Sequence, residues 1–306
     1  MQALLDTIAT LPRPTEAGRH FHGRGGLYPG CEAFTLDAYP PVWLFTSFAP
    51  VEEAALHTIG QALAARGAQV APGEPLNWVF QQRDESRATN RLMAGEVPAE
   101  HVVEEDGARY GVHLLRGQNH GFFLDMVEGR RWVRRWAAQQ PGGRVLNLFA
   151  YTCAFSVAAL QAGAGHVTNV DMAGGALSIG QRNHGLNGIA ARAAFMPHDI
   201  FNSWGKIKRG APYDLIVADP PSHQKGSFMA PKDYPRVMRR LPELLAPGGL
   251  ALLCLNTPKL GADFLLQGMQ AEAPTLQFVE RVANPAVFGD VSADRALKVM
   301  AFRAPD

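Results

Sequence analysis

A chain of 306 residues with 47% hydrophobic content can bury a full core and has room for two domains. It has no apolar run of about 18 residues, and its start carries an acid and no basic leader, so the pattern supports neither a membrane span nor a signal peptide. We therefore expect the protein in the cytoplasm. Three widely separated cysteines favour reduced thiols and exclude a paired zinc-ligand spacing, so we expect no metal.

Residues 1–118 are expected to form a small N-terminal α+β domain. A short helix with periodic apolar residues begins it, and a glycine- and proline-rich stretch makes residues 1–40 partly irregular. The pattern then predicts a helix over 51–66 that ends at Gly67, and strands over 41–46, 77–81, 101–104 and 109–114. This domain would have to contact RNA itself if the protein acts on RNA.

Residues 119–306 have the pattern of a larger α/β domain. An arginine-rich helix over 130–140 is ended by a Pro-Gly-Gly turn directly before the first buried strand. Apolar runs typical of parallel sheets predict strands over 144–149, 166–171, 194–199, 213–219 and 250–255, with a crossover helix over 155–163. A last strand over 298–302 suits a reversed hairpin at the end of the sheet.

Carboxylates end several of these strands. Ligands of a doubly wound sheet bind beyond the carboxyl ends of its strands, so Asp171, Asp219 and the loop after 144–149 should meet at one crevice. Asp171 is placed to bind ribose hydroxyls. The first loop lacks the Gly-x-Gly-x-x-Gly pattern that brings backbone amides to a pyrophosphate. A cofactor with an amino acid end, a ribose and a base fits better, and S-adenosylmethionine is the common one.

Four motifs in this order resemble the bacterial 23S ribosomal RNA large-subunit methyltransferase family, which contains 5-methylcytosine and 7-methylguanine enzymes. They are Gly121-Phe-Phe-Leu-Asp125 with the arginines that follow, Asn147-Leu-Phe-Ala-Tyr-Thr152, Val170-Asp171 with Ala176-Leu177 and Asn183, and Asp219-Pro-Pro221. The resemblance extends over residues 77–303 or so. It implies an α/β fold with a Rossmann-like class I methyltransferase sheet, and S-adenosylmethionine as the cofactor.

The resemblance also implies which residues contact the cofactor and the substrate. The expected cofactor contacts are Phe122, Phe123 and Asp125, which would close over it, Phe149, Ala150, Tyr151 and Thr152 around its amino acid end, Asp171 on ribose, Asp199 and Ile200 on adenine, and Asn147, Met172 and Asp219. The expected catalytic residues are Asp219, Pro220 and Asn256, and the expected substrate contacts are Ser222, His223, Arg131 and Arg239.

Cys153 departs from the family pattern, which usually has glycine after the Tyr-Thr pair. A positive backbone φ at this point would cost a non-glycine residue on the order of 1 kcal/mol. The affinity for the cofactor would be lower if the loop did not absorb this cost.

The most informative departure from the family pattern concerns the residue that would attack the base. Cytosine C5 becomes nucleophilic only after a thiolate adds to C6, so 5-methylcytosine enzymes need a cysteine beside the base. In carbon-methylating family members this cysteine follows the fifth strand, and the matching position here is Asn256, whereas we interpret Cys254 as a buried strand residue. Nitrogen methylation needs only alignment of a lone pair with the S–CH3 bond and exclusion of water. We therefore expect transfer to a base nitrogen, with guanine favoured, and no covalent intermediate.

Three clusters of basic residues could lead RNA phosphates to the crevice, although the formal net charge is only +1. They are Arg130, Arg131, Arg134 and Arg135; Lys206, Lys208 and Arg209; and Arg236, Arg239 and Arg240. The leading hypothesis is a methyltransferase whose partner is RNA, ribosomal by the resemblance. Two alternatives remain open: a methyltransferase of the same fold acting on a small molecule or a protein side chain, and a catalytically silent RNA-binding protein.

Overall fold

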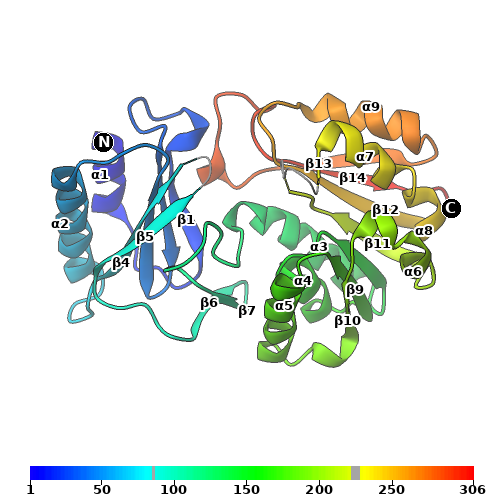
Figure 1. Cartoon of the computed structure of the whole chain (residues 1–306), viewed down its shortest axis with the longest axis horizontal. Coiled ribbons are helices and arrows are strands. Elements are labelled where there is room, and N and C mark those ends of the chain that lie inside the picture. The colour runs from blue at the N-terminus through cyan, green and yellow to red at the C-terminus, as the bar shows by residue number, and fades with distance from the viewer. Residues whose placement is uncertain (85–86, 222–227) are drawn as a thin grey trace. The chain divides into compact units, whose positions relative to one another are not determined.

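The computed structural model describes residues 1–84, 87–221 and 228–306. The chain forms two compact units (Figure 1). The first comprises Met1–Asp125 and Pro285–Val291, and the second comprises Met126–Asn284 and Ser292–Asp306. Among the described residues, no helix combines the length and the apolar character needed to cross a membrane.

A five-stranded sheet forms the centre of the first unit, in the order β1-β2-β3-β4-β5. Its strands are β1 (Gly18–His22), β2 (Phe34–Tyr39), β3 (Val42–Ser47), β4 (Asn77–Arg83) and β5 (Ala88–Ala94). β3 and β4 are parallel and are connected by α2 (Glu53–Val70), whereas the other neighbours are antiparallel. β6 (His101–Glu105) and β7 (Ala108–Val112) form a separate two-stranded sheet.

Two helices, α1 (Gln2–Thr10) and α2, pack on this sheet. Each buries a stripe of apolar residues at the three- and four-residue spacing of an amphipathic helix. The shared core includes Leu4, Ile8, Leu36, Phe45, Leu56 and Ile59. Contrary to expectation, α2 continues beyond Gly67 to Val70. A Cβ at Gly67 would meet no heavy atom within 4 Å, so this glycine is an ordinary helical residue that costs about 1 kcal/mol relative to alanine.

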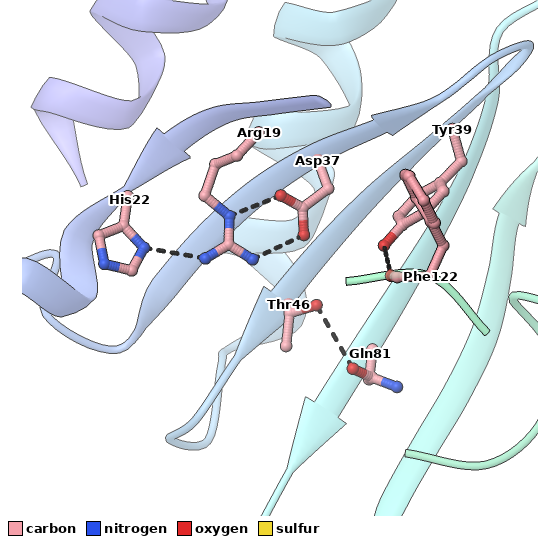
Figure 2. Close-up of polar contacts among 7 residues, drawn as sticks. All are labelled: Arg19, His22, Asp37, Tyr39, Thr46, Gln81 and Phe122. Carbon is pink, nitrogen blue, oxygen red and sulfur yellow. Dashed lines mark hydrogen bonds and ion pairs between the residues drawn. The ribbon is translucent and has the colours of Figure 1, made fainter. Parts of the chain in front are cut away.

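Residues 1–40 are more regular than the sequence suggested, because they contain β1 and β2. Arg19 of β1 lies opposite Asp37 of β2, and their side chains form a bidentate ion pair of 2.6 and 2.9 Å (Figure 2). These charged residues interrupt the apolar alternation by which a strand is identified in a sequence. The polar strand β5 was missed for the same reason.

A seven-stranded sheet forms the centre of the second unit, in the order β10-β9-β8-β11-β12-β14-β13. Its strands are β8 (Arg144–Leu148), β9 (His166–Asp171), β10 (Ala193–Pro197), β11 (Tyr213–Ala218), β12 (Leu245–Leu255), β13 (Gln277–Val282) and β14 (Lys298–Arg303). The first five strands of this order are parallel, whereas β14 is antiparallel to both β12 and β13. The prediction of a Rossmann-like α/β sheet with a reversed last strand is confirmed.

Helices cover both faces of this sheet (Figure 1). One layer contains α3 (Val127–Gln139), α4 (Ala154–Gln161) and α5 (Gly174–Leu186), and the other contains α6 (Trp204–Lys208), α7 (Ala230–Met238), α8 (Leu241–Leu244) and α9 (Ala262–Glu272). Short 3-10 turns are η1 (Gly23–Gly25), η2 (Leu124–Met126), η3 (Ala190–Arg192), η4 (Ile200–Asn202) and η5 (Ala286–Phe288). The helices of the second layer and the sheet share one apolar core that includes Leu146, Ile216, Tyr234, Met238, Leu253 and Leu265.

The units divide after Asp125, later than the boundary near residue 118 that the sequence indicated. Phe122 belongs to the first unit, because its ring stacks on Tyr110 at 4.4 Å and its carbonyl accepts a hydrogen bond from the Tyr39 hydroxyl (Figure 2). Pro285–Val291 joins the same unit through backbone and ring contacts to β1 and η1. A short return segment of this kind has no periodic pattern by which the sequence could show it.

Candidate active site

Four parallel strands of the second unit end at one edge of its sheet. β10, β9, β8 and β11 are neighbours, and their carboxyl ends lead to Asp199, Asp171, the loop 149–153 and Asp219, respectively. The backbone N–H of Asp219 donates to the carbonyl of Leu148 at 3.4 Å, which joins the ends of β11 and β8. Three carboxylates and one loop therefore lie where doubly wound folds bind their ligands.

The loop after β8 has a constrained backbone. Phe149, Tyr151 and Cys153 have φ values of 57°, 48° and 65°. A left-handed residue other than glycine costs about 1–2 kcal/mol, so other groups must hold the loop. Asp171 is one of them, because its two carboxylate oxygens accept hydrogen bonds from the N–H groups of Tyr151 at 2.8 Å and Ala173 at 2.7 Å. An ionised carboxylate offers about four acceptor sites, so Asp171 can still accept hydrogen bonds from ribose hydroxyls.

Cys153 has the positive φ that the family pattern predicted. Its side chain is fully buried and packs with Ala150 and Leu177. A Cβ added to Gly180 of α5 would lie only 2.5 Å from Cys153 Sγ, so glycine at this point leaves room for the thiol. Burial, and secondarily the charge of Asp171, raises the pKa of the Cys153 thiol far above its ordinary value. The thiol is therefore protonated and serves as a packing group.

A buried chain of hydrogen bonds lies next to this loop. The Asn147 amide donates to Asn169 at 2.9 Å, Asn169 donates to the Ser156 hydroxyl at 3.1 Å, and that hydroxyl lies 2.8 Å from His184 Nε2. His184 Nδ1 lies 2.7 Å from the carbonyl of Gly180 and must donate to it, so Nε2 accepts from Ser156. Burial lowers the pKa of His184, which keeps its ring neutral.

The structure thus places Asn147 inside the domain rather than on the open edge where the sequence put a cofactor contact. Its exposed fraction is 1%, and its amide joins β8 to β9. The sequence reasoning missed Ser156, Asn169 and His184 altogether. Asn169 was the available signal, because an amide within an apolar parallel strand needs a buried partner.

A cavity of about 340 Å³ lies beside the end of β10. Its lining combines charged and aromatic side chains, namely Asp199, Phe201, Asn202, Phe228, Met229, Lys232, Asp233 and Arg236. The Asp199 carboxylate accepts hydrogen bonds from Phe201 N at 2.9 Å and from Asn202 Nδ2 at 2.6 Å. The guanidinium of Arg236 lies 4.0 Å from the centre of the Phe201 ring. Such a lining can hold a polar aromatic group.

The other residues expected to bind the cofactor differ in exposure. The side chains of Ala150, Thr152 and Ile200 are buried and pack inside the domain. The carbonyl of Thr152 accepts a hydrogen bond from Asn183 at 3.0 Å, which ties the loop to α5. Met172, directly after Asp171, is 60% exposed and is available for apolar contact with a ligand.

The ends of β11 and β12 carry the residues expected to be catalytic. Asp219 and Pro220 follow β11, and the exposed Asn256 follows β12. Parallel neighbours end at the same edge, so the structure brings these residues to one side of the sheet. The hydroxyl of Tyr234, a buried residue of α7, lies 2.7 Å from the carbonyl oxygen of Cys254 and 3.3 Å from that of the last residue of β11. It therefore holds the two strand ends together.

Two further residues near these strand ends are fully buried. Cys254 has no exposed surface, which confirms its interpretation as a packed strand residue. Lys298 of β14 is also fully buried, and its ammonium group donates to the carbonyls of Thr257 at 2.6 Å and Asp294 at 2.9 Å. It thereby anchors the segment that follows Asn256. The sequence reasoning missed Tyr234 and Lys298, because neither residue lies in a motif.

Five of the residues expected to contact the cofactor or the substrate do not lie in the described part of the second unit. Ser222 and His223 lie outside the described residues. Phe122, Phe123 and Asp125 belong to the first unit, and Phe122 is buried there whereas Phe123 is 41% exposed. Their contact with the cofactor stays a prediction.

The arginines expected to contact the substrate have partners within the protein. Arg131 forms an ion pair with Glu128 at 2.8 Å, and Arg239 forms a bidentate pair with Glu272 at 2.7 and 3.0 Å. Arg130, which belongs to the same predicted cluster as Arg131, is only 2% exposed. A phosphate would have to compete with these carboxylates, so the role of Arg131 and Arg239 in RNA binding stays a prediction.

The polar and aromatic groups at this edge fit a cofactor with an amino acid end, a ribose and a base. The loop 147–153 contains no glycine and offers no cradle for phosphates. Asp171 retains acceptors for ribose, and Asp199 adds a carboxylate beside aromatic rings. The fold and the site define an S-adenosylmethionine-dependent methyltransferase. The profile of that family matches residues 18–303, so the chain belongs to it.

Comparison with individual proteins supports the resemblance seen in the motifs. Ribosomal RNA large subunit methyltransferase I of Aeromonas salmonicida (strain A449) is 30% identical over 250 residues, 80% of this chain and 62% of the relative. Ribosomal RNA large subunit methyltransferase K/L of Psychrobacter sp. (strain PRwf-1) is 35% identical over 194 residues, 60% of this chain and 23% of the relative. The chain thus spans less than two thirds of these relatives.

A solved structure extends the comparison to the whole fold. SMU.776, a protein assigned to the methyltransferases and crystallised in complex with SAH, has a TM-score of 0.80 and 27% identity to this chain. The similarity covers 95% of this chain and 76% of that one. S-adenosylmethionine is accordingly the cofactor of this enzyme.

Proposed function

We propose that this enzyme methylates a base nitrogen in RNA, with a guanine of ribosomal RNA as the favoured target, and that no covalent enzyme–base intermediate forms. The observation that carries the proposal is the exposed Asn256 after β12, at the position where the family resemblance implies a cysteine in carbon-methylating members. Cys31, Cys153 and Cys254 are all buried. No thiol is therefore exposed for attack on C6 of a cytosine.

The residues at the strand ends suit nitrogen methylation. Bound S-adenosylmethionine supplies an electrophilic methyl group, so the protein has to bind the base, direct its lone pair and exclude water. The Asp219 carboxylate and the Pro220 carbonyl can accept hydrogen bonds from an amino or imino group of guanine. The Asn256 amide can both donate to and accept from a base edge.

The cofactor contacts form part of the same proposal. We assign the ribose hydroxyls to Asp171, the base to the surroundings of Asp199, and the amino acid end to the loop 149–152. The available acceptors on the Asp171 carboxylate support the first assignment, and the aromatic lining next to Asp199 supports the second. We assign apolar contact with the ribose or the base to Met172, and its exposure supports this assignment.

RNA as the substrate is supported by the two relatives, both of which are named as ribosomal RNA large subunit methyltransferases. Because each relative is considerably longer than the matched region, their target positions do not transfer to this chain. Acting on ribosomal RNA, the enzyme would work in the cytoplasm.

Mass spectrometry of ribosomal RNA nucleosides tests the proposal. A deletion strain should lack one methylated guanine, and the purified enzyme with S-adenosylmethionine should restore it on RNA from that strain. Loss of 5-methylcytosine instead would overturn the assignment to nitrogen. Methyl transfer to a small molecule or a protein, with none to RNA, would favour the alternative substrates.

The absence of a covalent intermediate has its own test. Replacing Cys31, Cys153 and Cys254 together by serine or alanine should leave turnover within a factor of about ten, provided that the variant folds. RNA containing 5-fluorocytosine should form no stable adduct with the enzyme. An adduct that forms with the wild type and not with Cys254→Ala would overturn this proposal. The protein would then be a 5-methylcytosine enzyme whose nucleophile is Cys254 instead of a cysteine at position 256.

A further inference from the structure

Three strands of the first unit end at the same edge of its sheet. β1 and β3 are both antiparallel to β2, and β4 is parallel to β3, so β1, β3 and β4 run in the same direction. Arg24 follows β1, Phe48 follows β3, and Arg83 is the last residue of β4. The guanidinium carbon of Arg24 lies 3.7 Å from the centre of the Phe48 ring, and that of Arg83 lies 5.1 Å from it.

Within the described residues, no carboxylate is bound to Arg24 or Arg83. Arg19 lies nearby, but Asp37 binds its guanidinium through two hydrogen bonds, and Arg19 donates a third to His22 (Figure 2). Burial, together with the charges of Arg19 and Arg24, lowers the pKa of His22 to about 4, so this ring is neutral at pH 7.

Arg24 and Arg83 differ from Arg19 in the part of the chain that the structure describes. No carboxylate within the described residues forms an ion pair with either of them. Partial burial, and then repulsion from the neighbouring arginines, lowers the pKa of both side chains. Arg83 Nε is buried without a hydrogen-bond partner in the described structure. An anion at this edge would form the ion pairs that no described carboxylate forms with these two guanidinium groups.

The backbone holds Arg24 in place. A Cβ at Gly23 would lie 1.8 Å from the carbonyl oxygen of Cys31, and one at Gly25 would lie 1.9 Å from that of Gly289. Only glycine fits on either side of Arg24, so η1 lies directly against two other backbone segments. The side chain of Arg24 is nevertheless exposed. A fixed backbone that presents an exposed guanidinium is suited to ligand binding, because little conformational freedom remains to be lost.

We propose that Arg24 and Arg83, positioned around Phe48, form a binding site for phosphates of the RNA backbone. This inference rests on the proposed function, since it assigns to the first unit a contact with the same substrate. Guanidinium groups bind phosphate oxygens through paired hydrogen bonds, and they retain their charge when they stack on an aromatic ring. The contact would be independent of sequence and would position the RNA rather than select the base.

The salt dependence of RNA binding tests this site. The probe is a fluorescein-labelled single-stranded RNA of mixed sequence, and binding is followed by anisotropy. In the double variant Arg24→Gln/Arg83→Gln, the slope of log affinity against log salt should decrease by about 1.4, or about 0.7 for each lost phosphate contact. Between about 50 and 200 mM salt, the wild type should therefore lose about sevenfold more affinity than the double variant.

Two control variants distinguish the loss of this site from a general loss of positive charge. Arg91→Gln also removes one arginine from the first unit, but Arg91 is bound to Glu53 at 2.6 and 3.2 Å, so this variant should keep the wild-type slope. Arg24→Lys/Arg83→Lys keeps the charges and should keep the slope while weakening affinity, because an ammonium group cannot form the paired, stacked contact. Affinity for S-adenosylmethionine should be unchanged in every variant, and cooperative thermal unfolding should show that each variant is folded.

An unchanged slope in Arg24→Gln/Arg83→Gln, with wild-type RNA binding and methylation intact, would overturn the phosphate site and leave the proposed function standing. A slope that decreases as much in Arg91→Gln would also overturn it, because the effect would then reflect overall charge. If the wild-type enzyme neither binds nor methylates RNA, the proposed function itself is wrong, and this inference with it.

Discussion

The contact between Cys153 and Gly180 allows the geometry under the cofactor loop to be tested quantitatively. Alanine is the better helix former by about 1 kcal/mol, so Gly180→Ala would stabilise α5 if the position were open. The new Cβ would instead lie 2.5 Å from Cys153 Sγ and 3.1 Å from Cys153 Cβ. Overpacking a closed core costs about 1–3 kcal/mol. We therefore expect a net loss of up to about 2 kcal/mol in the free energy of unfolding.

Cys153→Gly removes the two closest contacts of the new Cβ and leaves one, with the backbone carbon of Thr152 at 3.3 Å. It relieves the left-handed backbone, worth about 1–2 kcal/mol, and loses the contacts of a small buried side chain, worth a similar amount, so alone it should be nearly neutral. In this background Gly180→Ala should stabilise the protein by at most about 1 kcal/mol, because the contact with the Thr152 backbone remains. The two substitutions should consequently be coupled by about 1–3 kcal/mol.

A double-mutant cycle measured by urea unfolding gives this coupling free energy. Gly185→Ala is the matched control, because it makes the same change in the same helix at a point where a Cβ meets no heavy atom within 4 Å. It should be slightly stabilising. Calorimetric titration should show weaker binding of S-adenosylmethionine to Gly180→Ala and unchanged binding to Gly185→Ala. Additivity within about 0.5 kcal/mol would refute the contact between Cys153 and Gly180.

Three further predictions concern cofactor affinity, pH and turnover. Asp171→Ala should weaken S-adenosylmethionine binding by about 1.5–3 kcal/mol in titration calorimetry, and an unaltered affinity would exclude the ribose role. Burial lowers the pKa of His184 from 6.5 in the folded state, so the unfolded state binds more protons and the free energy of unfolding should decrease as pH falls below 6.5. His184→Gln should make the decrease shallower in urea unfolding, and an identical pH dependence would contradict a neutral buried ring. Asp219→Ala should reduce turnover at saturating S-adenosylmethionine about a hundredfold or more, and a loss below about tenfold in methyl incorporation would contradict its role in orienting the base.

The parallel strands and their terminal acids could be predicted from the sequence for a physical reason. A strand covered on both faces is rich in apolar residues, and residues 215–218 form a continuous apolar run directly before Asp219, whereas His166–Asp171 has buried valines at positions 167 and 170 and ends in a carboxylate. The order of the strands was accessible only through the family resemblance. Apolar periodicity does not reveal which strand lies beside which.

Side-chain partners far apart in the chain could not be predicted. Arg19 and Asp37 satisfy each other across two strands, which permits charged residues in a sheet that the sequence left irregular. Asn147 was expected to contact the cofactor because it opens the first motif, yet its amide is bound to Asn169 on the neighbouring strand. In both cases the decisive contact exists only after the sheet has formed.

The proposed chemistry also explains why the strand ends are held by buried polar groups. A thiol that bonds to a base places that base covalently, whereas a base held by hydrogen bonds alone is only as well aligned as the groups that bind it. Tyr234 links the carbonyls at the ends of β11 and β12, and Lys298 binds the backbone that follows Asn256. Buried side chains thus hold the backbone from which Asp219 and Asn256 extend.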